Sequence, residues 1–375
     1  MLKQWNSPWN PFNSAKVLMW YKHLKGCADE NYLIPVSVDI DPSNRCNFKC
    51  QWCNANGIIE EGGRDMSQKH LFELADFIAT WGKNTPEGNP KSVCVAGGGE
   101  PLMNPNTLPF LERLKHNGIE SGLITNGSLI KDIHVDVIAK SCRWVGFSMD
   151  AATPTTYNKI KFQTDCSDSR LFDIVCNNMR KMAKRINELG VKNDLCFKFL
   201  LSPTNYTEIY EAVDLAKSLG AKDFHLRPVG YQNLVGTSDF NVVYTPEMLY
   251  EIEQQMQAAM KLSDESFRVY GITDKFNPDF TIKKQFSRCW TIPLLPTFSA
   301  DGNVYLCFDI RGRKDTILCR HDEDITEIAR IWNTEKHKTM VKNIDINTCP
   351  RCTFTVYNEI VEQVINKDSM CRLFP

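Results

Sequence analysis

Three cysteines stand close together in the stretch RCNFKCQWCNA, residues 45–55, at Cys46, Cys50 and Cys53. A closed tetrahedral metal site takes four protein ligands, whereas a site that performs chemistry keeps one coordination position open. A zinc site would need a fourth ligand nearby, and residues 54–66 contain no cysteine or histidine. Three thiolates can instead bind three irons of a [4Fe–4S] cluster and leave one iron open. The spacing favours such a cluster, with zinc or unrelated thiols as the alternatives.

Four further cysteines lie near the C-terminus. Cys289 is followed by twelve residues and Gly302, then by four residues and Cys307, and the C-x2-C pair Cys349 and Cys352 comes later. Four thiolates form a complete ligand set, either for a cluster without an open iron or for a structural zinc ion. Buried cysteine otherwise behaves as a small hydrophobe. Six other cysteines are expected to be packing residues: Cys27, Cys94, Cys142, Cys166, Cys176 and Cys196.

The composition argues against several other classes of function. The chain has 375 residues, 42% hydrophobic and 24% charged, as in an ordinary globular protein of about two domains. Its 44 basic and 45 acidic residues give a net charge of −1, which argues against a nucleic-acid partner. Residues 1–26 lack the apolar run of a signal peptide, and no stretch approaches the roughly 20 apolar residues of a membrane span. We expect a cytoplasmic protein without a membrane partner, whose cysteines bind metal rather than form disulfides.

A β/α framework must position the first cysteine group. Helical patterns separate six β-rich runs at 36–40, 92–96, 121–125, 144–148, 195–199 and 223–227. This alternation indicates parallel strands, in an open doubly wound sheet or in a β/α barrel. A helix is expected to begin after Ser67, and two others to end at Gly190 and Gly220. The first cysteine group follows the first strand, so it is expected at the carboxyl ends of the strands, where βα loops build active sites.

The polarity of the strand faces favours the barrel. A doubly wound sheet is covered on both faces and requires nearly continuous apolar strands. Strands with one polar face suit a lumen that surrounds a ligand, so the fold class is expected to be α/β with a partial (β/α)6 TIM-like barrel. The polar positions on these strands are Ser37, Asp39, Asp41, Ser148, Asp150, Lys198, Asp223, His225 and Arg227.

The same patterns divide the chain into four segments. An N-terminal extension is expected at 1–35 and the barrel at 36–245. A connecting helix and linker are expected at 246–285. The cysteines and short glycine-punctuated runs of 286–375 indicate a small second domain.

The first cysteine group carries a family resemblance. C-x3-C-x2-C with an aromatic residue, Trp52, before the last cysteine resembles the hallmark of radical S-adenosylmethionine (SAM) enzymes. In that superfamily SAM chelates the open iron through its amino and carboxylate groups. An electron from the cluster cleaves SAM to methionine and a 5′-deoxyadenosyl radical, which abstracts a hydrogen atom from the substrate. The resemblance covers about residues 36–228 and implies this chemistry here.

Three more segments support the resemblance. AGGGEP (96–101), ITNGS (124–128) and SMDAATPTTYNKI (148–160) follow the second, third and fourth strands, like the superfamily's GGEP, TNG and S-x-D segments. Glycines let backbone approach a ligand, and a carboxylate accepts from an ammonium group, so GGGEP is expected at the SAM amino group, with a plain tight turn as the alternative. The residues that the resemblance assigns to cofactor binding are Trp52, Gly98, Gly99, Glu100, Pro101, Thr125, Asn126, Ser148 and Asp150.

The second cysteine group resembles the twitch domain of some radical SAM enzymes, which holds one auxiliary [4Fe–4S] cluster. The larger SPASM domain holds two clusters and continues with further cysteines, whereas residues 353–370 contain none. Cys319 and Cys371 are left over, too few for a second complete set. Structural zinc is the alternative. The ligands implied by the resemblance are Cys289, Cys307, Cys349 and Cys352.

The sequence also bears on the reaction. Many peptide-modifying relatives carry an additional N-terminal recognition domain, whereas 45 residues precede Cys46 here, which favours a small polar or sugar-like substrate over a ribosomal peptide. An auxiliary cluster can take the electron of a substrate radical, as an oxidation requires. Epimerisation would need a hydrogen donor such as Cys319 or Cys371.

Candidate catalytic residues are Lys198, His225 and Arg227 in the lumen, together with Cys319; the alternative for the lumen residues is buried ion pairing with Asp39, Asp150 or Asp223. The electron donor is expected to be a flavodoxin or ferredoxin. An iron–sulfur or zinc interaction module is the non-enzymatic alternative, and it would leave GGGEP and TNG without a role.

Overall fold

One sheet of ten strands runs through the protein in the order β10-β9-β8-β1-β2-β3-β4-β5-β6-β7. The computed structural model describes residues 14–60, 63–229, 242–271, 284–349 and 352–366. From β1 to β7 each strand pairs in parallel with the next along the chain. These strands are β1 (Ser37–Asp41), β2 (Ser92–Val95), β3 (Glu120–Thr125), β4 (Trp144–Ser148), β5 (Asp194–Leu201), β6 (Asp223–Pro228) and β7 (Arg268–Gly271).

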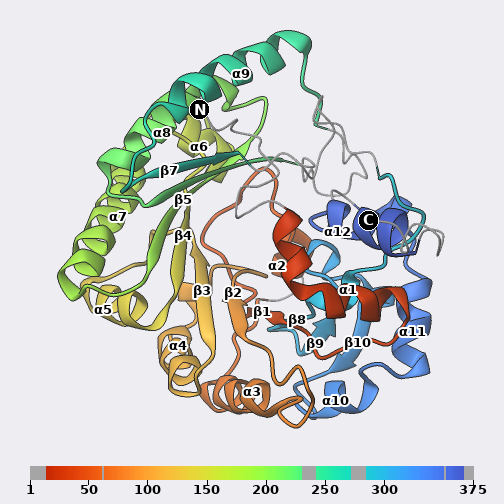
Figure 1. Ribbon diagram of the computed structural model, residues 1–375. Helices are drawn as coiled ribbons and strands as arrows, with labels where there is room; N and C mark the ends of the chain where they lie inside the picture. The colour runs from red at the N-terminus through yellow and green to blue at the C-terminus, as the bar shows by residue number, and fades with distance from the viewer. Residues whose placement is uncertain (1–13, 61–62, 230–241, 272–283, 350–351, 367–375) are drawn as a thin grey trace.

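Helices cover the outer face of this curved sheet (Figure 1). The parallel part does not close, because β1 pairs on its other side with β8 and not with β7. The six predicted strands and the partial β/α barrel are confirmed. The helices of the barrel are α2 (Asn56–Glu60), α3 (Gln68–Thr80), α4 (Thr107–His116), α5 (Asp132–Ser141), α6 (Pro154–Phe162), α7 (Arg170–Leu189), α8 (Ile209–Ser218) and α9 (Pro246–Met260).

Local sequence signals set several helix boundaries. Ser67 caps α3, since its side chain accepts from the backbone N–H of His70. Gly190 ends α7 in the left-handed conformation at φ 60°. Gly220 has φ 82° just beyond α8. The predicted cap and both predicted stops are therefore present.

The strand β7 lies within the stretch predicted as connecting helix and linker. Its four residues are too few for an alternating pattern of apolar and polar side chains to be recognised in the sequence. It is anchored to β6 through the side chains, because Nε of Arg268 donates to Oδ1 of the buried Asp223 at 2.7 Å. Asp223, a possible ion-pair partner of the lumen cations, is thus paired with Arg268.

The C-terminal region continues the barrel sheet. β8 pairs in parallel with β1, and β9 and β10 follow in antiparallel order. The strands and helices of this region are β8 (Thr297–Ser299), β9 (Asn303–Tyr305), β10 (Ile317–Arg320), α10 (Glu327–Ile331), α11 (Glu335–Lys342), α12 (Thr355–Glu359) and the π-helix η8 (Ile360–Ile365).

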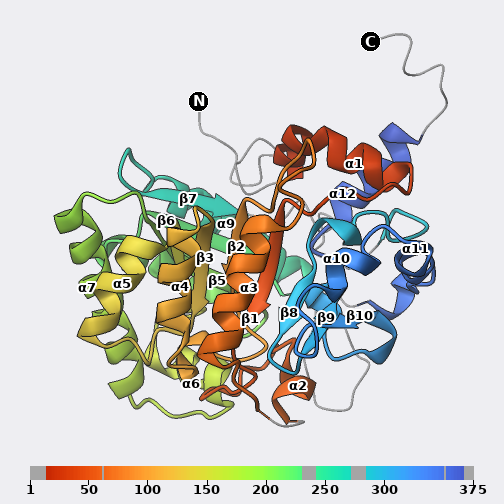
Figure 2. The ribbon, with the colours of Figure 1, turned by 90° about the horizontal axis from the view of Figure 1, so that it is seen from below.

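The N-terminal segment packs on the end of this region. The 3₁₀-helix η1 (Ser14–Trp20) leads into α1 (Tyr21–Ala28), which lies beside α12 (Figure 2). A separate apolar cluster joins the two ends of the described chain, formed by Val17, Leu24, Val361 and Ile365.

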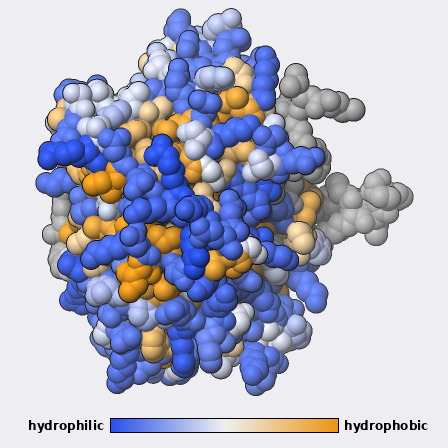
Figure 3. Space-filling model, turned by 90° about the vertical axis from the view of Figure 1, so that its left-hand side faces the viewer, coloured by the Kyte–Doolittle hydropathy of each residue, from blue (hydrophilic) through white to orange (hydrophobic). Residues whose placement is uncertain are grey.

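The face of the barrel helices seen in Figure 3 is mostly hydrophilic, with hydrophobic patches between the charged side chains. Exposed apolar side chains on these helices include Ile133 of α5 and Ile174 of α7. Among the residues that the structure describes, none of the helices has the length and apolar character needed to cross a membrane.

Candidate active site

The cysteines of the C-x3-C-x2-C motif lie in a loop at the carboxyl end of β1. This cysteine loop (residues 42–55) leads into α2, and its three thiols are half-buried. It is hydrogen-bonded to α6, because the backbone N–H of Lys49 donates to the carbonyl oxygen of Lys161 at 2.9 Å. The loop thus lies at the end of the barrel where the sequence places it.

At least one pair of these thiols is spaced more widely than a zinc ion requires. A tetrahedral zinc ion with Zn–S bonds of about 2.3 Å holds its sulfur ligands about 3.8 Å apart. In the described part of the chain, no three cysteine sulfurs lie within 4.8 Å of one another. A cubane binds each thiolate to a different iron and so keeps the sulfurs farther apart. Burial raises the pKa of Cys46 to about 11 and of Cys50 to about 12, so at neutral pH these groups are thiols unless a metal binds them.

Gly98 and Gly99 lie against the cysteine loop. A Cβ atom on Gly99 would stand 2.3 Å from the carbonyl oxygen of Arg45. One on Gly98 would stand 2.5 Å from Oδ1 of Asn44. Both distances are far below the contact distance of non-bonded atoms. These glycines therefore allow two protein loops to approach closely, a requirement that holds with or without a ligand.

The Glu100 carboxylate joins two of the predicted segments. Its Oε1 accepts from Oγ1 of Thr125 at 2.6 Å and from the backbone N–H of Leu102 at 3.1 Å. Its Oε2 accepts from the backbone N–H of Asn126 at 2.7 Å. Burial raises the pKa of Glu100, and these hydrogen bonds oppose the rise. Because each carboxylate oxygen can accept about two hydrogen bonds, Oε2 can accept one more.

Asn126 connects the same segments to the cysteine loop. Its Nδ2 donates to Oδ1 of Asn47 at 2.9 Å, and its Oδ1 accepts from the hydroxyl of Ser128 at 2.7 Å. Asn47 in turn donates to that hydroxyl at 2.9 Å. Since Asn47 directly follows Cys46, the loop after β3 helps to fix the first cysteine.

Asp150 forms a buried ion pair with Lys161 of α6. Nζ of Lys161 lies 2.5 Å from Oδ2 of Asp150, and both side chains are about 2% exposed. Oδ1 of Asp150 also accepts from the backbone N–H of Leu200 at 2.7 Å. Burial lowers the pKa of Lys161, but Asp150 and the sulfurs of Cys50 and Cys46, when ionised, raise it by more, so a cation lies beside the cysteine loop. Asp150 thus pairs with Lys161 and not with Lys198, the partner that the sequence left possible.

A cavity of about 710 Å³ lies inside the barrel. Its walls come from the strands, from η1 and from the C-terminal region. Burial lowers the pKa of His225 well below its ordinary value, so this imidazole is neutral. The predicted lumen positions that line the cavity are Ser37, Asp39, Ser148, Asp150, Lys198, His225 and Arg227.

Other predicted site residues lie elsewhere. Cys319 is buried in β10, is 6% exposed and does not line the cavity. Trp52 packs into the hydrophobic core. Pro101 begins the short 3₁₀-helix η2 (Pro101–Met103), and Cys371 lies outside the described residues.

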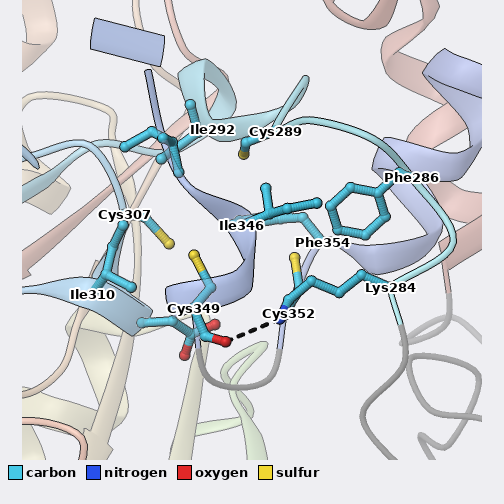
Figure 4. A pocket seen from close by; sticks show the side chains of 12 residues that line it. Lys284, Phe286, Cys289, Ile292, Cys307, Ile310, Ile346, Cys349, Cys352 and Phe354 are labelled. Atoms are coloured by element: carbon cyan, nitrogen blue, oxygen red, sulfur yellow. Dashed lines mark hydrogen bonds between the residues drawn. The ribbon is translucent and has the colours of Figure 1, made fainter. Parts of the chain in front are cut away.

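The four cysteines of the second group surround one small cavity in the C-terminal region. Figure 4 shows that all four sulfur atoms turn into this space. Cys289 and Cys352 are held together by Asn358 of α12, whose Nδ2 donates to Sγ of Cys352 at 3.7 Å. Oδ1 of Asn358 accepts at 2.7 Å from the backbone N–H of Trp290, the residue after Cys289. Apolar side chains form much of the remaining wall: Phe286, Ile292, Ile310, Ile344, Ile346 and Phe354.

The barrel cavity is lined by neighbours of both cysteine groups, although none of these cysteines lines it in the described part of the chain. Asn54, next to Cys53, lines it, and its Nδ2 donates to the carbonyl oxygen of Phe308 at 3.5 Å. Phe354 lines both this cavity and the cavity of the second cysteine group. The ring of Phe308 stands 6.1 Å from that of Phe354 and also faces the barrel cavity. A molecule in the barrel would therefore be separated from the second group by an aromatic wall.

Two charged residues of this region were not found from the sequence. Lys161 is a cation on the buried face of α6. A charged residue on a mainly apolar helix face is the one sequence signal that could have identified it. Arg311 of the C-terminal region donates to Oδ2 of Asp41 at 2.8 Å, and both side chains are buried. No local pattern marks Arg311, because its partner lies on β1.

Comparison with known proteins agrees with this geometry. The sequence profile of the Radical SAM superfamily matches residues 40–235. The chain is 25% identical over 332 residues to the "Tungsten-containing aldehyde ferredoxin oxidoreductase cofactor-modifying protein" of Pyrococcus furiosus, covering 84% of this chain and 86% of that one. It is 23% identical over 316 residues to the GTP 3′,8-cyclase of Staphylococcus epidermidis, covering 78% and 86%.

Solved structures share the fold. SuiB of Streptococcus suis, bound to its precursor peptide SuiA, matches with a TM-score of 0.63 at 17% identity, over 98% of this chain and 82% of that one. The protein anSMEcpe with bound AdoMet and a peptide matches with a TM-score of 0.52 at 18% identity, over 82% and 83%. The profile match covers more than half of the chain, and it follows that this protein belongs to the Radical SAM superfamily and is an enzyme of that superfamily.

Proposed function

We propose that Cys46, Cys50 and Cys53 bind a [4Fe–4S] cluster whose fourth iron takes SAM. The observation that carries this proposal is the set of hydrogen bonds and close contacts that join the loops after β1, β2, β3 and β4 around these cysteines. When bound, the reduced cluster supplies the electron that cleaves SAM and so generates the radical that removes a hydrogen atom from the substrate. Lys161 offsets part of the thiolate charge.

The loops around the cysteines offer groups for SAM in the proposed site. Oε2 of Glu100 accepts one hydrogen bond and can accept a second, such as one from the SAM ammonium group. Ser148 and Asp150 line the barrel cavity at the carboxyl end of β4. Thr125 donates a hydrogen bond to Glu100, and Asn126 donates one to the cysteine loop. These two residues therefore act by positioning those groups. The reductant is proposed to be a flavodoxin or ferredoxin.

Cys289, Cys307, Cys349 and Cys352 are proposed to bind one auxiliary [4Fe–4S] cluster, as in a twitch domain. Support comes from their convergence on one cavity and from their spacing, which is wider than zinc requires. The apolar wall would shield the cluster from water, and the amide of Asn358 would donate to a ligating sulfur. A structural zinc ion is the alternative.

The proposed reaction is the oxidation of a small polar or sugar-like molecule. Support comes from the barrel cavity, which extends to the wall of the proposed auxiliary site, so that an electron released by a substrate radical has a nearby acceptor. Epimerisation with Cys319 as hydrogen donor is disfavoured, because Cys319 does not reach this cavity. The Pyrococcus furiosus relative is named for modifying a cofactor, which favours a small molecule.

A ribosomal peptide is the second candidate substrate. The fold similarity to peptide-bound SuiB spans 98% of this chain, which favours it. Anaerobically reduced protein incubated with SAM tests the proposal common to both candidates. We expect 5′-deoxyadenosine and methionine to be released, and the absence of both would reject the proposal.

Gly99→Ala is expected to displace the cysteine loop. The new methyl group would collide with the carbonyl of Arg45, which directly precedes Cys46. The anaerobically reconstituted variant should therefore lose the iron bound at this loop, about half of the total, and lose SAM cleavage. Gly57→Ala is the control, because a Cβ there meets nothing within 4 Å. Equal iron content in the two variants would contradict the expectation.

Glu100→Gln is expected to weaken SAM binding by roughly ten- to a hundredfold, because losing a charged hydrogen-bond partner costs about 1.5–3 kcal/mol. The amide also brings an NH₂ group toward the N–H of Asn126, so the melting temperature should fall. Equilibrium dialysis with SAM and a thermal melt check both effects. Glu112→Gln, on the exposed face of α4, is the control. A lower melting temperature with unchanged SAM affinity would show that Glu100 is only a structural link.

A further inference from the structure

Cationic side chains outnumber carboxylates among the described residues that line the barrel cavity. Among the described residues, the two carboxylates that line it are Asp39 and Asp150. Asp150 is already paired with Lys161. Burial raises the pKa of Asp39 to about 7, so this carboxyl is partly neutral at neutral pH. The cationic side chains of the described wall are Lys16, Lys198, Arg227 and Arg311, of which Arg311 is already paired with Asp41.

The Lys198 ammonium group points away from the proposed SAM residues. Lys198 pairs in register with Ser148, at the carboxyl end of β4. A Cβ atom on Gly146 would stand 2.2 Å from Cε of Lys198, so the lysine side chain lies across Gly146. Nζ stands 5.1 Å from the centre of the Trp144 ring, at the beginning of β4. The ammonium group therefore lies toward the amino ends of the strands, opposite to the cysteine loop.

A second cation enters the cavity from the neighbouring strand, nearer to the carboxyl ends of the strands. Arg227 is on β6, two residues beyond His225, which pairs in register with Lys198. Neighbouring strands are about 4.8 Å apart, so the two cations approach the cavity from adjacent strands. Lys16 of η1 adds a third charge from the exposed end of the cavity wall. Burial lowers the pKa of both Lys198 and Lys16, and the charge of Arg227 lowers both further.

No carboxylate lies within 4.0 Å of Nζ of Lys198 in the described part of the chain. Its ammonium group lies over the face of the Trp144 ring. Cys196 and Cys94 also face it, as thiols whose pKa burial raises, so they contribute no charge at neutral pH. A buried cation that gains an anionic partner regains the stabilisation that it lost on leaving water.

We propose that Lys198 and Arg227, with Lys16 at the cavity mouth, bind a carboxylate or phosphate group of the substrate. The assignment to a substrate rests on the proposed function, whereas the anion site itself does not. SAM is the other possible source of a carboxylate. SAM carries one carboxylate but also an ammonium and a sulfonium group, so its net charge is positive and it offers Lys198 no net anionic partner. The aromatic side chains Trp20, Trp144, Phe308, Phe354 and Tyr357 suit an apolar or planar part of the same molecule.

Binding of anionic probes to the anaerobically reconstituted full-length protein tests this site. Pyrophosphate and citrate are titrated by calorimetry at low ionic strength, with and without SAM. We expect at least one probe to bind, more weakly as salt is added. Lys198→Met should weaken its binding by ten- to a hundredfold and leave SAM affinity unchanged. Lys181→Met, on the surface of α7 beside Asp132, is the matched control and should bind the probe as wild type does.

Gly146→Ala provides a second variant that keeps every charge. Its methyl group would displace the Lys198 side chain, so probe binding should also weaken. Iron content and a thermal melt establish that each variant is folded.

The site is refuted if neither probe binds the wild-type protein, or if the probe binds Lys198→Met with unchanged affinity. If Lys198→Met instead loses SAM binding while probe binding persists, the cation serves the SAM carboxylate. Probe binding without any SAM cleavage by wild type would reject the proposed function and leave the anion site standing.

Discussion

Simultaneous replacement of Cys46, Cys50 and Cys53 by alanine is expected to abolish SAM cleavage and to remove about half of the iron. Two cubanes hold about eight irons, and the triple variant retains ligands for one of them. The second cysteine group cannot substitute, because four protein thiolates leave no iron open to SAM. Anaerobic reconstitution, iron analysis and chromatography of 5′-deoxyadenosine measure both effects.

Cys166→Ala is the control for this experiment, since Cys166 is exposed and belongs to neither cysteine group. It should keep the iron content and the cleavage rate of the wild-type protein. Release of 5′-deoxyadenosine by the triple variant would overturn the assignment of the SAM-binding cluster.

The double variant Cys349→Ala, Cys352→Ala is expected to separate SAM cleavage from product formation. It should lose about half of the iron and still release 5′-deoxyadenosine, because the first cysteine group is intact. Product should disappear, since a substrate radical in the barrel cavity would lose its electron acceptor behind Phe354. Iron analysis, Mössbauer spectra and parallel assays of 5′-deoxyadenosine and product provide the measurement.

Cys319→Ala serves as the control, because Cys319 is buried outside both cavities and should be dispensable for both clusters. Normal product formation by the double variant would mean that the second group is structural. Zinc in the wild-type C-terminal region would contradict the assignment of its ligands.

The sequence was informative wherever the determining contacts are local. Strand and helix patterns, the Ser67 cap and the Gly190 stop depend on residues close in the chain, and the structure contains all of them. The polar face of the strands also predicted several of the side chains that line the barrel cavity, because alternation along a strand fixes the side to which each residue points, but Asp41 and Asp223 on the same face do not line it.

Contacts between distant segments were not predictable in the same way. The sequence suggested a ligand as the reason for Gly99, whereas the structure shows the carbonyl of Arg45 against it. It offered Asp150 as a partner for Lys198, but helix α6 brings Lys161 to that carboxylate. Arg311 reaches Asp41 only because β8 pairs with β1. Each of these depends on how loops and strands pack in three dimensions.

The pairing of β1 with β8 has a consequence for how the chain folds. Asp39 pairs with Thr297, so one side of the strand that leads into the cysteine loop stays without its neighbour until most of the chain has been synthesised. Contacts of such sequence separation slow folding, and an unpaired strand edge is a template for aggregation. Chains truncated before residue 297 would expose this edge permanently. We expect them to accumulate as insoluble protein, because β1 would be left open to pair with other chains.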